Sequence, residues 1–272
     1  MTIYEVIEDS AREFPRRTAY SYFSKHCTYE EFKRDIDSTA SGLLSMGIKS
    51  GDRVAVTAMN SPETITGIYA LNKIGAVAVM LNPKSPAKEL TGQLRLTKAK
   101  AIIYSSLVEN SVNEAIQESD VTLAIRINSL KGLSIKFLVG SLWKNLWSGE
   151  KRVPFPERVK RISFHKLTGE MSDYVNRDEM TDAMIFFGGG SSGRLRAVVH
   201  SSQSVDLSAE NCLKTERELD GSESMLAMLP AFHMFGFVVV IHIAFRGGIR
   251  CVMIPIFEKK HCARMLLKGN VT

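Results

Sequence analysis

A glycine- and serine-rich loop is the part of this sequence best suited to chemistry. It follows an apolar run and reads Gly-Gly-Gly-Ser-Ser-Gly over residues 188–193, with Arg196 close behind. Because such a loop has little side-chain bulk, its backbone N–H groups and serine hydroxyls can surround a phosphate chain while the arginine neutralises charge. The loop therefore predicts a phosphate-binding site, and a flexible connector is the alternative with the same composition.

Two other phosphate-binding patterns fit the loop less well. Three of its glycines satisfy the spacing of a dinucleotide fingerprint, but that fingerprint needs a helix opening at the last glycine and an acidic residue about 20 positions on. The β-branched run 197–200 predicts a strand instead, and the nearest acids, Asp206 and Glu210, fall within the next predicted helix. A Walker A loop ends in Gly-Lys-Ser/Thr, whereas this loop continues Gly-Arg-Leu. We therefore expect neither a dinucleotide-binding loop nor a Walker A loop at this position.

Other short motifs stand in a fixed order around the loop. Residues 229–237 read Leu-Pro-Ala-Phe-His-Met-Phe-Gly-Phe. Upstream lie Thr-Tyr-Glu-Glu at 28–31, Gly-Asp-Arg-Val-Ala-Val at 51–56, Asn-Ser-Pro-Glu at 60–63 and Ala-Leu-Asn-Lys-Ile-Gly-Ala at 70–76. In this order they resemble the adenylate-forming (AMP-binding) superfamily, which includes acyl-CoA synthetases, luciferases and peptide-synthetase adenylation domains. The resemblance indicates the N-terminal portion of such an enzyme.

The resemblance implies an acid–thiol ligase of the acyl-CoA synthetase type. Such enzymes convert a carboxylic acid and ATP into an acyl-adenylate and pyrophosphate, with Mg2+, and usually pass the acyl group to coenzyme A. The apolar helix predicted after His233 would suit a fatty or other apolar acid. The residues that the resemblance places on the ATP phosphates are Gly188, Gly189, Gly190, Ser191, Ser192, Gly193 and Arg196, with Ser192 near the magnesium ion. His233, Phe232 and Gly236 would line the acyl/adenylate pocket.

Departures from the family pattern bear on activity. Leu195, Arg196 and Ala197 stand where the family loop has Pro, Lys and Gly, which changes loop stiffness and replaces a flexible point charge by a planar fork. The family's Tyr-Gly-x-Thr-Glu segment, ribose-binding Asp and C-terminal lid domain with the catalytic Lys find no match. No complete catalytic set is expected in this chain, and a missing C-terminal half would supply it. The alternative is a catalytically inactive nucleotide-binding or scaffolding protein derived from the same family.

The elements expected to position these residues alternate between helix and strand, as a largely parallel α/β sheet requires. Apolar periodicity and capping signals predict helices at about 29–46, 62–74, 86–97, 108–118, 205–219, 234–245 and 258–267, and strands at about 53–58, 76–81, 101–104, 121–127, 183–187, 197–200, 225–228 and 249–254. We expect a truncated α/β fold, the large N-terminal region of the acyl-CoA synthetase/luciferase-like fold with sheets flanked by helices. Its first part would cover about 1–180 and its second 181–272, ending at a strand start near Val271.

The basic surplus of the chain is local. The net charge is +6, and residues 131–166 hold nine Lys or Arg against two Glu, so the rest is near neutral and no nucleic-acid partner is expected. Leu130–Trp147 predicts an amphipathic helix that could pack on its own domain or lie in a membrane interface. The N-terminus lacks a signal-peptide pattern, no apolar run approaches a membrane span, and the four cysteines form no CxxC pair. A cytoplasmic protein is expected.

Overall fold

The computed structural model describes residues 1–129, 152–169, 173–188, 195–214 and 222–255. The helices predicted at Leu130–Trp147 and 258–267 lie outside these residues, as does most of the glycine loop (189–194). The strand start predicted near Val271 lies outside them as well.

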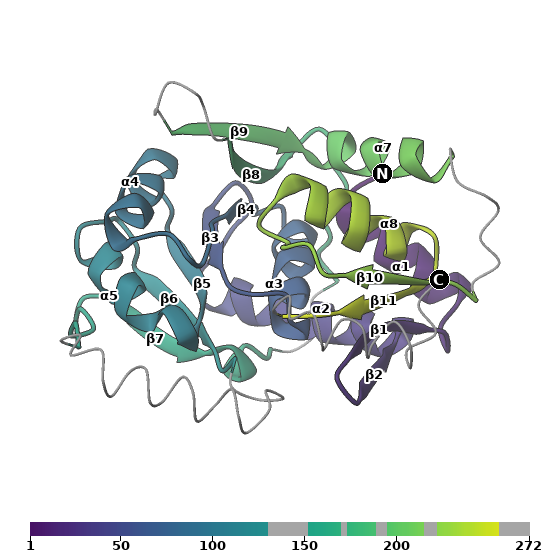
Figure 1. The fold of residues 1–272 in the computed structure, drawn as a ribbon, viewed down its shortest axis with the longest axis horizontal. Helices are drawn as coiled ribbons and strands as arrows, with labels where there is room; N and C mark the ends of the chain where they lie inside the picture. Colours follow the sequence, from purple (N-terminus) through teal and green to yellow (C-terminus); the bar gives the residue numbers. More distant parts are fainter. Residues whose placement is uncertain (130–151, 170–172, 189–194, 215–221, 256–272) are drawn as a thin grey trace.

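A seven-stranded sheet forms the larger part of the described fold, as Figure 1 shows. Its order is β7 (Lys160–Ser163), β6 (Leu123–Ile127), β5 (Ala101–Ser105), β3 (Arg53–Thr57), β4 (Val77–Met80), β8 (Asp182–Gly188) and β9 (Arg196–Ser201). All neighbours are parallel except β8 and β9, which form an antiparallel pair. The predicted, largely parallel α/β sheet is confirmed.

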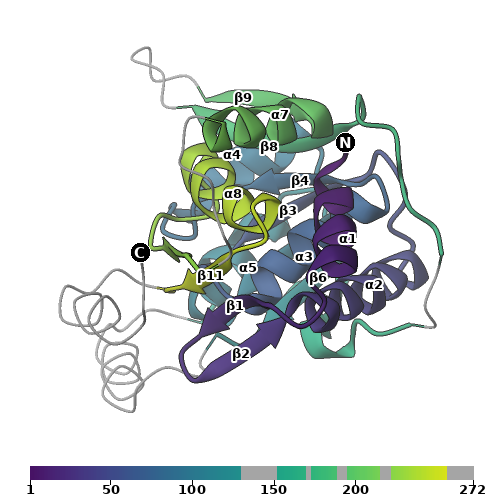
Figure 2. The ribbon, with the colours of Figure 1, turned by 90° about the vertical axis from the view of Figure 1, so that its right-hand side faces the viewer.

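The two faces of this sheet belong to different cores. Alternate residues point to opposite faces of a strand, so Val54 and Val56 join one cluster while Ala55 joins the other. The helices α4 (Ala87–Thr97) and α5 (Glu109–Gln117) cover the face of Ala55. On the other face lie α1 (Ile3–Glu13), α2 (Tyr29–Ser45), α3 (Pro62–Lys73), α7 (Ser202–Leu213) and α8 (Ile243–Arg246), as Figure 2 shows from the side.

A second sheet of four strands packs against this helical layer. Its order is β10 (Ser224–Ala227), β11 (Arg250–Met253), β1 (Thr18–Tyr22) and β2 (Lys25–Thr28). The parallel pairing of β1 with β11 brings Tyr20 opposite Cys251 and so joins segments from the two ends of the described chain. Each sheet therefore takes strands from both sides of residue 180.

Local capping signals fix several of the helix ends. Thr28 and Glu31 form the predicted capping box at the start of α2, and Gly47 follows its end at φ 83°. Pro62 is the first residue of α3, after the N-cap Ser61.

Two predicted helices differ from the structure. The one predicted from Val205 begins at Ser202, because the Ser201 hydroxyl accepts the backbone N–H of Ser204 as an N-cap. The one predicted over 234–245 is a π-helix at Gly236–His242 that continues as α8.

A buried ion cluster ties three helices of the shared layer together. The Asp37 carboxylate on α2 accepts hydrogen bonds from Lys73 of α3, Lys33 of α2 and the Tyr4 hydroxyl of α1, each at 2.7 Å. Lys73 and Asp37 are each 4% exposed. These bonds hold the pKa of Asp37 below its usual value although burial acts to raise it.

Within the described ranges, no helix is long and apolar enough to cross a membrane.

Candidate functional site

The β8–β9 hairpin holds the two ends of the glycine loop side by side. Gly188 is the last residue of β8 and lies opposite Arg196, the first residue of β9. The remaining predicted phosphate-binding residues lie between them and outside the described residues (Gly189, Gly190, Ser191, Ser192 and Gly193). β8 is itself fixed by parallel pairing with β4. The segment after the loop is the predicted strand, so the helix that a dinucleotide fingerprint needs is not there.

Among the described residues, no acidic side chain pairs with Arg196, which lies opposite Gly188 at the end of the hairpin. The Arg196 side chain is exposed, and no hydrogen bond or ion pair joins it to another described residue. A Cβ added at Gly188 would meet no atom within 4 Å. A guanidinium that no other described residue binds, beside open backbone, is a fitting partner for a phosphate oxygen.

The proposed magnesium ion has less support from side chains than the phosphates have. Ser192, the residue that the resemblance places near the ion, lies outside the described residues. Among the residues described, no group of three His, Cys, Asp or Glu side chains could hold a metal ion. The expectation of a magnesium ion therefore depends on the family pattern and on the tendency of magnesium to bind together with ATP phosphates.

The second predicted site is a tight turn that leads into the π-helix. The backbone N–H of His233 donates to the Pro230 carbonyl at 3.0 Å, and the His233 carbonyl accepts from Phe237 at 2.9 Å. The His233 side chain is exposed, and the half-buried Phe232 ring lies at 5.9 Å from it. Gly236 is buried so closely that an added Cβ would stand 2.2 Å from the Pro230 oxygen. At this position the glycine is required by close packing of backbone on backbone.

Asn60, which is far from this turn in the sequence, holds the turn in place through its side chain. Its side-chain amide donates to the carbonyls of Ala227 at 3.2 Å and Leu229 at 2.9 Å, and its oxygen accepts from the backbone N–H of Ala231 at 2.8 Å. The sequence identified residues 60–63 and 229–237 as separate motifs and did not predict that one holds the other. The sequence carries no local sign of this contact. In the structure the Asn60 amide is buried, and a buried amide needs partners.

A buried cluster of polar side chains joins α7, which follows the β8–β9 hairpin, to the π-helix, which follows His233. His242, at the end of the π-helix, shares a 2.8 Å hydrogen bond between Nδ1 and the Tyr69 hydroxyl, and its Nε2 lies 3.6 Å from the Asp206 carboxylate of α7. Arg246 Nε lies 3.0 Å from the same carboxylate oxygen. Burial lowers the pKa of His242, and Asp206 acts in the opposite direction. The helix after the β8–β9 hairpin is thereby connected to the π-helix after His233.

Comparison with known proteins places this geometry in a family. The model of the AMP-binding enzyme family matches residues 7–272. A long-chain-fatty-acid–CoA ligase of Bacillus subtilis is 25% identical over 100% of this chain and 49% of its own length. The Mycobacterium tuberculosis fatty acyl CoA synthetase superposes over 99% of this chain and 48% of its own, with a TM-score of 0.77 and 20% identity.

A third relative was solved with a nucleotide. The O-succinylbenzoate coenzyme A synthetase of Bacillus subtilis, in complex with AMP, superposes over 98% of this chain and 60% of its own, with a TM-score of 0.72 and 19% identity. At these identities the structural likeness establishes the fold. The chain spans about half the length of the curated relatives it matches.

Proposed function

Because the chain belongs to the AMP-binding enzyme family, we propose that it is the N-terminal portion of an ATP-dependent acyl-activating ligase. In the whole enzyme, a carboxylate oxygen would attack the α-phosphorus of ATP, and the bond to pyrophosphate would break. The acyl group of the resulting acyl-adenylate would then pass to the thiol of coenzyme A, releasing AMP. A fatty or other apolar acid is the substrate we favour, and the cytoplasm the location.

The observation that carries this proposal is the hairpin that holds the glycine loop. Antiparallel pairing brings Gly188 opposite Arg196, so a loop rich in backbone donors starts and ends beside a guanidinium free of other described partners. In this arrangement Arg196 would bind a phosphate oxygen and hold the triphosphate for in-line attack. His233, exposed on a turn that Asn60 fixes, would bind near the carboxylate. When bound, magnesium would neutralise the charge of the phosphates.

ATP binding by the 272-residue chain is the first test. Isothermal titration with ATP and magnesium should give saturable binding, and Arg196→Ala should weaken it by about 1.5–3 kcal/mol, the usual worth of a hydrogen bond to a charged group. Arg12→Ala is a matched control, because Arg12 is an exposed arginine of α1 that pairs with Asp9. Absence of binding at millimolar ATP, or equal affinity of Arg196→Ala and the parent chain, would contradict the phosphate role.

A catalytically inactive nucleotide-binding or scaffolding protein is the second candidate. It is favoured by the exposed Leu195 and by Ala197, which replace the proline and glycine of the family loop. The two candidates differ in the chemistry that bound ATP undergoes. Pyrophosphate release from ATP and a fatty acid, after a polypeptide equivalent to the relatives' second half is added, would support the ligase. Binding without release in that mixture would support the inactive protein.

A further inference from the structure

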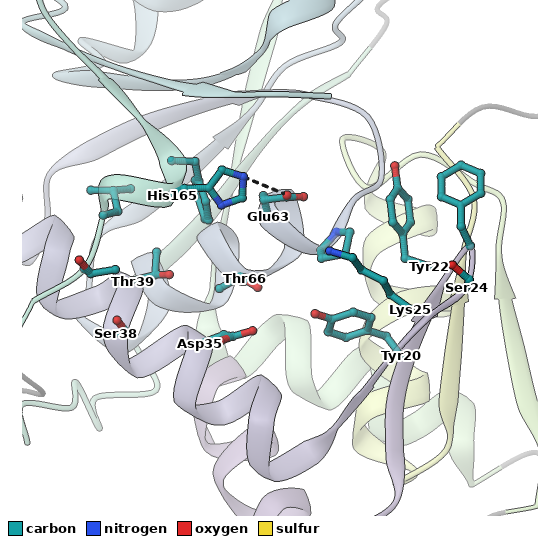
Figure 3. A pocket seen from close by; sticks show the side chains of 15 residues that line it. Tyr20, Tyr22, Ser24, Lys25, Asp35, Ser38, Thr39, Glu63, Thr66 and His165 are labelled. Atoms are coloured by element: carbon teal, nitrogen blue, oxygen red, sulfur yellow. Dashed lines mark ion pairs between the residues drawn. The ribbon is translucent and has the colours of Figure 1, made fainter. Parts of the chain in front are cut away.

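A separate cleft opens where the β1–β2 hairpin meets α2, α3 and residues 164–168, as Figure 3 shows. Its volume is about 390 Å³, within the range of small-molecule sites. None of the residues that line it comes from β8, β9 or the 229–237 segment. The cleft is therefore distinct from the site proposed for ATP and the acyl group.

Aromatic side chains and carboxylates share the walls of this cleft. Tyr20, Tyr22 and Phe23 supply rings from the hairpin, while Asp35 of α2 and Glu63 of α3 supply negative charge. Figure 3 shows the Asp35 carboxylate and the Tyr20 hydroxyl turned toward one another across the open space. Burial raises the pKa of Tyr20 most, Cys27 contributes next, and the charge of Asp35 adds a smaller effect in the same direction.

Several polar groups in the cleft have no side-chain partner among the described residues. The Asp35 side chain is exposed, and no hydrogen bond or ion pair joins it to another described residue. Partial desolvation by neighbouring atoms raises its pKa. Thr66 and Thr39 are only 4% and 5% exposed, and within the described parts of the chain neither hydroxyl has a hydrogen-bond partner. The two hydroxyls are nearly buried, and buried polar groups are normally satisfied, so they point to a ligand that carries donors and lies beside the Asp35 carboxylate.

The balance of charge selects the kind of ligand. Among the described residues, the one ion contact of Glu63 is a long one of 3.8 Å with His165, and Lys25 is the one Lys or Arg that lines the cleft. An anion would face two carboxylates, whereas a cation would have both a carboxylate and aromatic faces. We propose that this cleft binds a small organic ammonium ion with an aromatic body, its charged end beside Asp35 and Thr66 and its body against Tyr20 and Tyr22.

Three ligands of equal size separate charge from apolar contact. 2-Phenylethylammonium should bind saturably to the 272-residue chain in a calorimetric or NMR titration. 2-Phenylethanol keeps the ring and loses the charge, and phenylacetate reverses the charge, so both should bind at least several-fold more weakly. Equal binding of 2-phenylethanol would show that the cleft recognises only an apolar body and would overturn the proposal. Absence of ammonium binding at millimolar concentration would overturn it as well.

Two substitutions locate the charged end. Asp35→Asn should weaken 2-phenylethylammonium binding by roughly five- to thirty-fold, between the worth of an exposed ion pair and that of a buried charged hydrogen bond. Thr66→Val, which keeps the shape of the side chain, should weaken it by a smaller factor. Asp120→Asn is the matched control, because Asp120 is exposed and does not line the cleft.

Unchanged affinity in Asp35→Asn would refute the proposed orientation. Because Asp35 bonds no described residue, this variant should keep its unfolding midpoint, and that midpoint serves as the check on the fold. The titration needs no ATP, so its result is independent of the outcome of the ATP-binding test.

Discussion

Replacing Asn60 by alanine should lower the free energy of unfolding by about 2–5 kcal/mol. The side chain is 3% exposed and makes three hydrogen bonds to the 227–231 turn. Alanine cannot make any of these bonds, so the turn that carries His233 would lose the side-chain contacts that hold it in place. The effect should therefore be both global, on stability, and local, on this turn.

The three lost bonds do not cost the same. The Ala227 carbonyl keeps a second partner, the backbone N–H of Ile254 at 3.3 Å. Leu229 is 38% exposed, so water can replace much of its bond, at a cost of roughly 0–1 kcal/mol. Ala231 is 1% exposed, and its orphaned N–H should cost about 1–3 kcal/mol. The space left by the amide adds about 1 kcal/mol.

Urea unfolding of the 272-residue chain measures the global effect, and amide hydrogen exchange at Ala231 and His233 measures the local one. Asn82→Ala is the control, because Asn82 is exposed and its side-chain oxygen accepts one hydrogen bond, from the backbone N–H of Lys84. We expect the control to lose less than about 1 kcal/mol. If Asn60→Ala were no less stable than Asn82→Ala, or if Ala231 exchange were unchanged, the anchoring role argued for Asn60 would be wrong.

Three further predictions concern buried contacts. Gly236→Ala should destabilise the chain by about 1–3 kcal/mol, because the new Cβ would stand 2.2 Å from a carbonyl oxygen. Gly92→Ala in α4, where the nearest atom is at 3.6 Å, should be neutral or stabilise by up to about 1 kcal/mol, and equal effects in urea unfolding would contradict the packing argument. Lys73→Met should cost about 2–4 kcal/mol because the buried Asp37 carboxylate loses a cation, and the loss should persist in about 1 M salt, where a screened surface pair would show none. Stability should fall as the pH drops from about 7 to about 5.5, because burial lowers the pKa of His242 and the unfolded chain binds the proton first. His242→Gln should flatten this part of the stability–pH curve, and an unchanged slope would assign it to other groups.

Local signals predicted elements well where the cause of an element is local. The capping box of Thr28 and Glu31 predicted the start of α2, and the glycine after it predicted the end. The β1–β2 hairpin was missed because its turn lacks the usual signals: Phe23 takes the positive φ of 54° where glycine or asparagine is expected. The helix α1 also escaped prediction, although Thr2 and Glu5 form a capping box of the same kind.

Long-range pairing set the limit on predicting the candidate site. The sequence identified Arg196 and His233 from motifs, but it carries no local sign that β1 pairs with β11 or that Asn60 reaches the 227–231 turn. These contacts depend on which face each strand buries, which becomes apparent only when all elements are packed. The cleft around Asp35 escaped prediction for the same reason, since its walls come from four separate parts of the chain: the β1–β2 hairpin, α2, α3 and residues 164–168.

The motifs that carry the family pattern divide into residues that build the scaffold and residues that we propose contact ATP. Asn60 and Gly236 belong to the first kind, because one bonds the turn and the other allows its close packing. Leu195, Arg196 and Ala197 belong to the second kind, and these are the positions where the chain departs from the family. Since the scaffold residues keep the pattern, departures at the exposed end of a hairpin need not weaken the fold. Retained fold is therefore no measure of retained nucleotide binding, and only a direct titration with Arg196→Ala beside the parent chain separates the two.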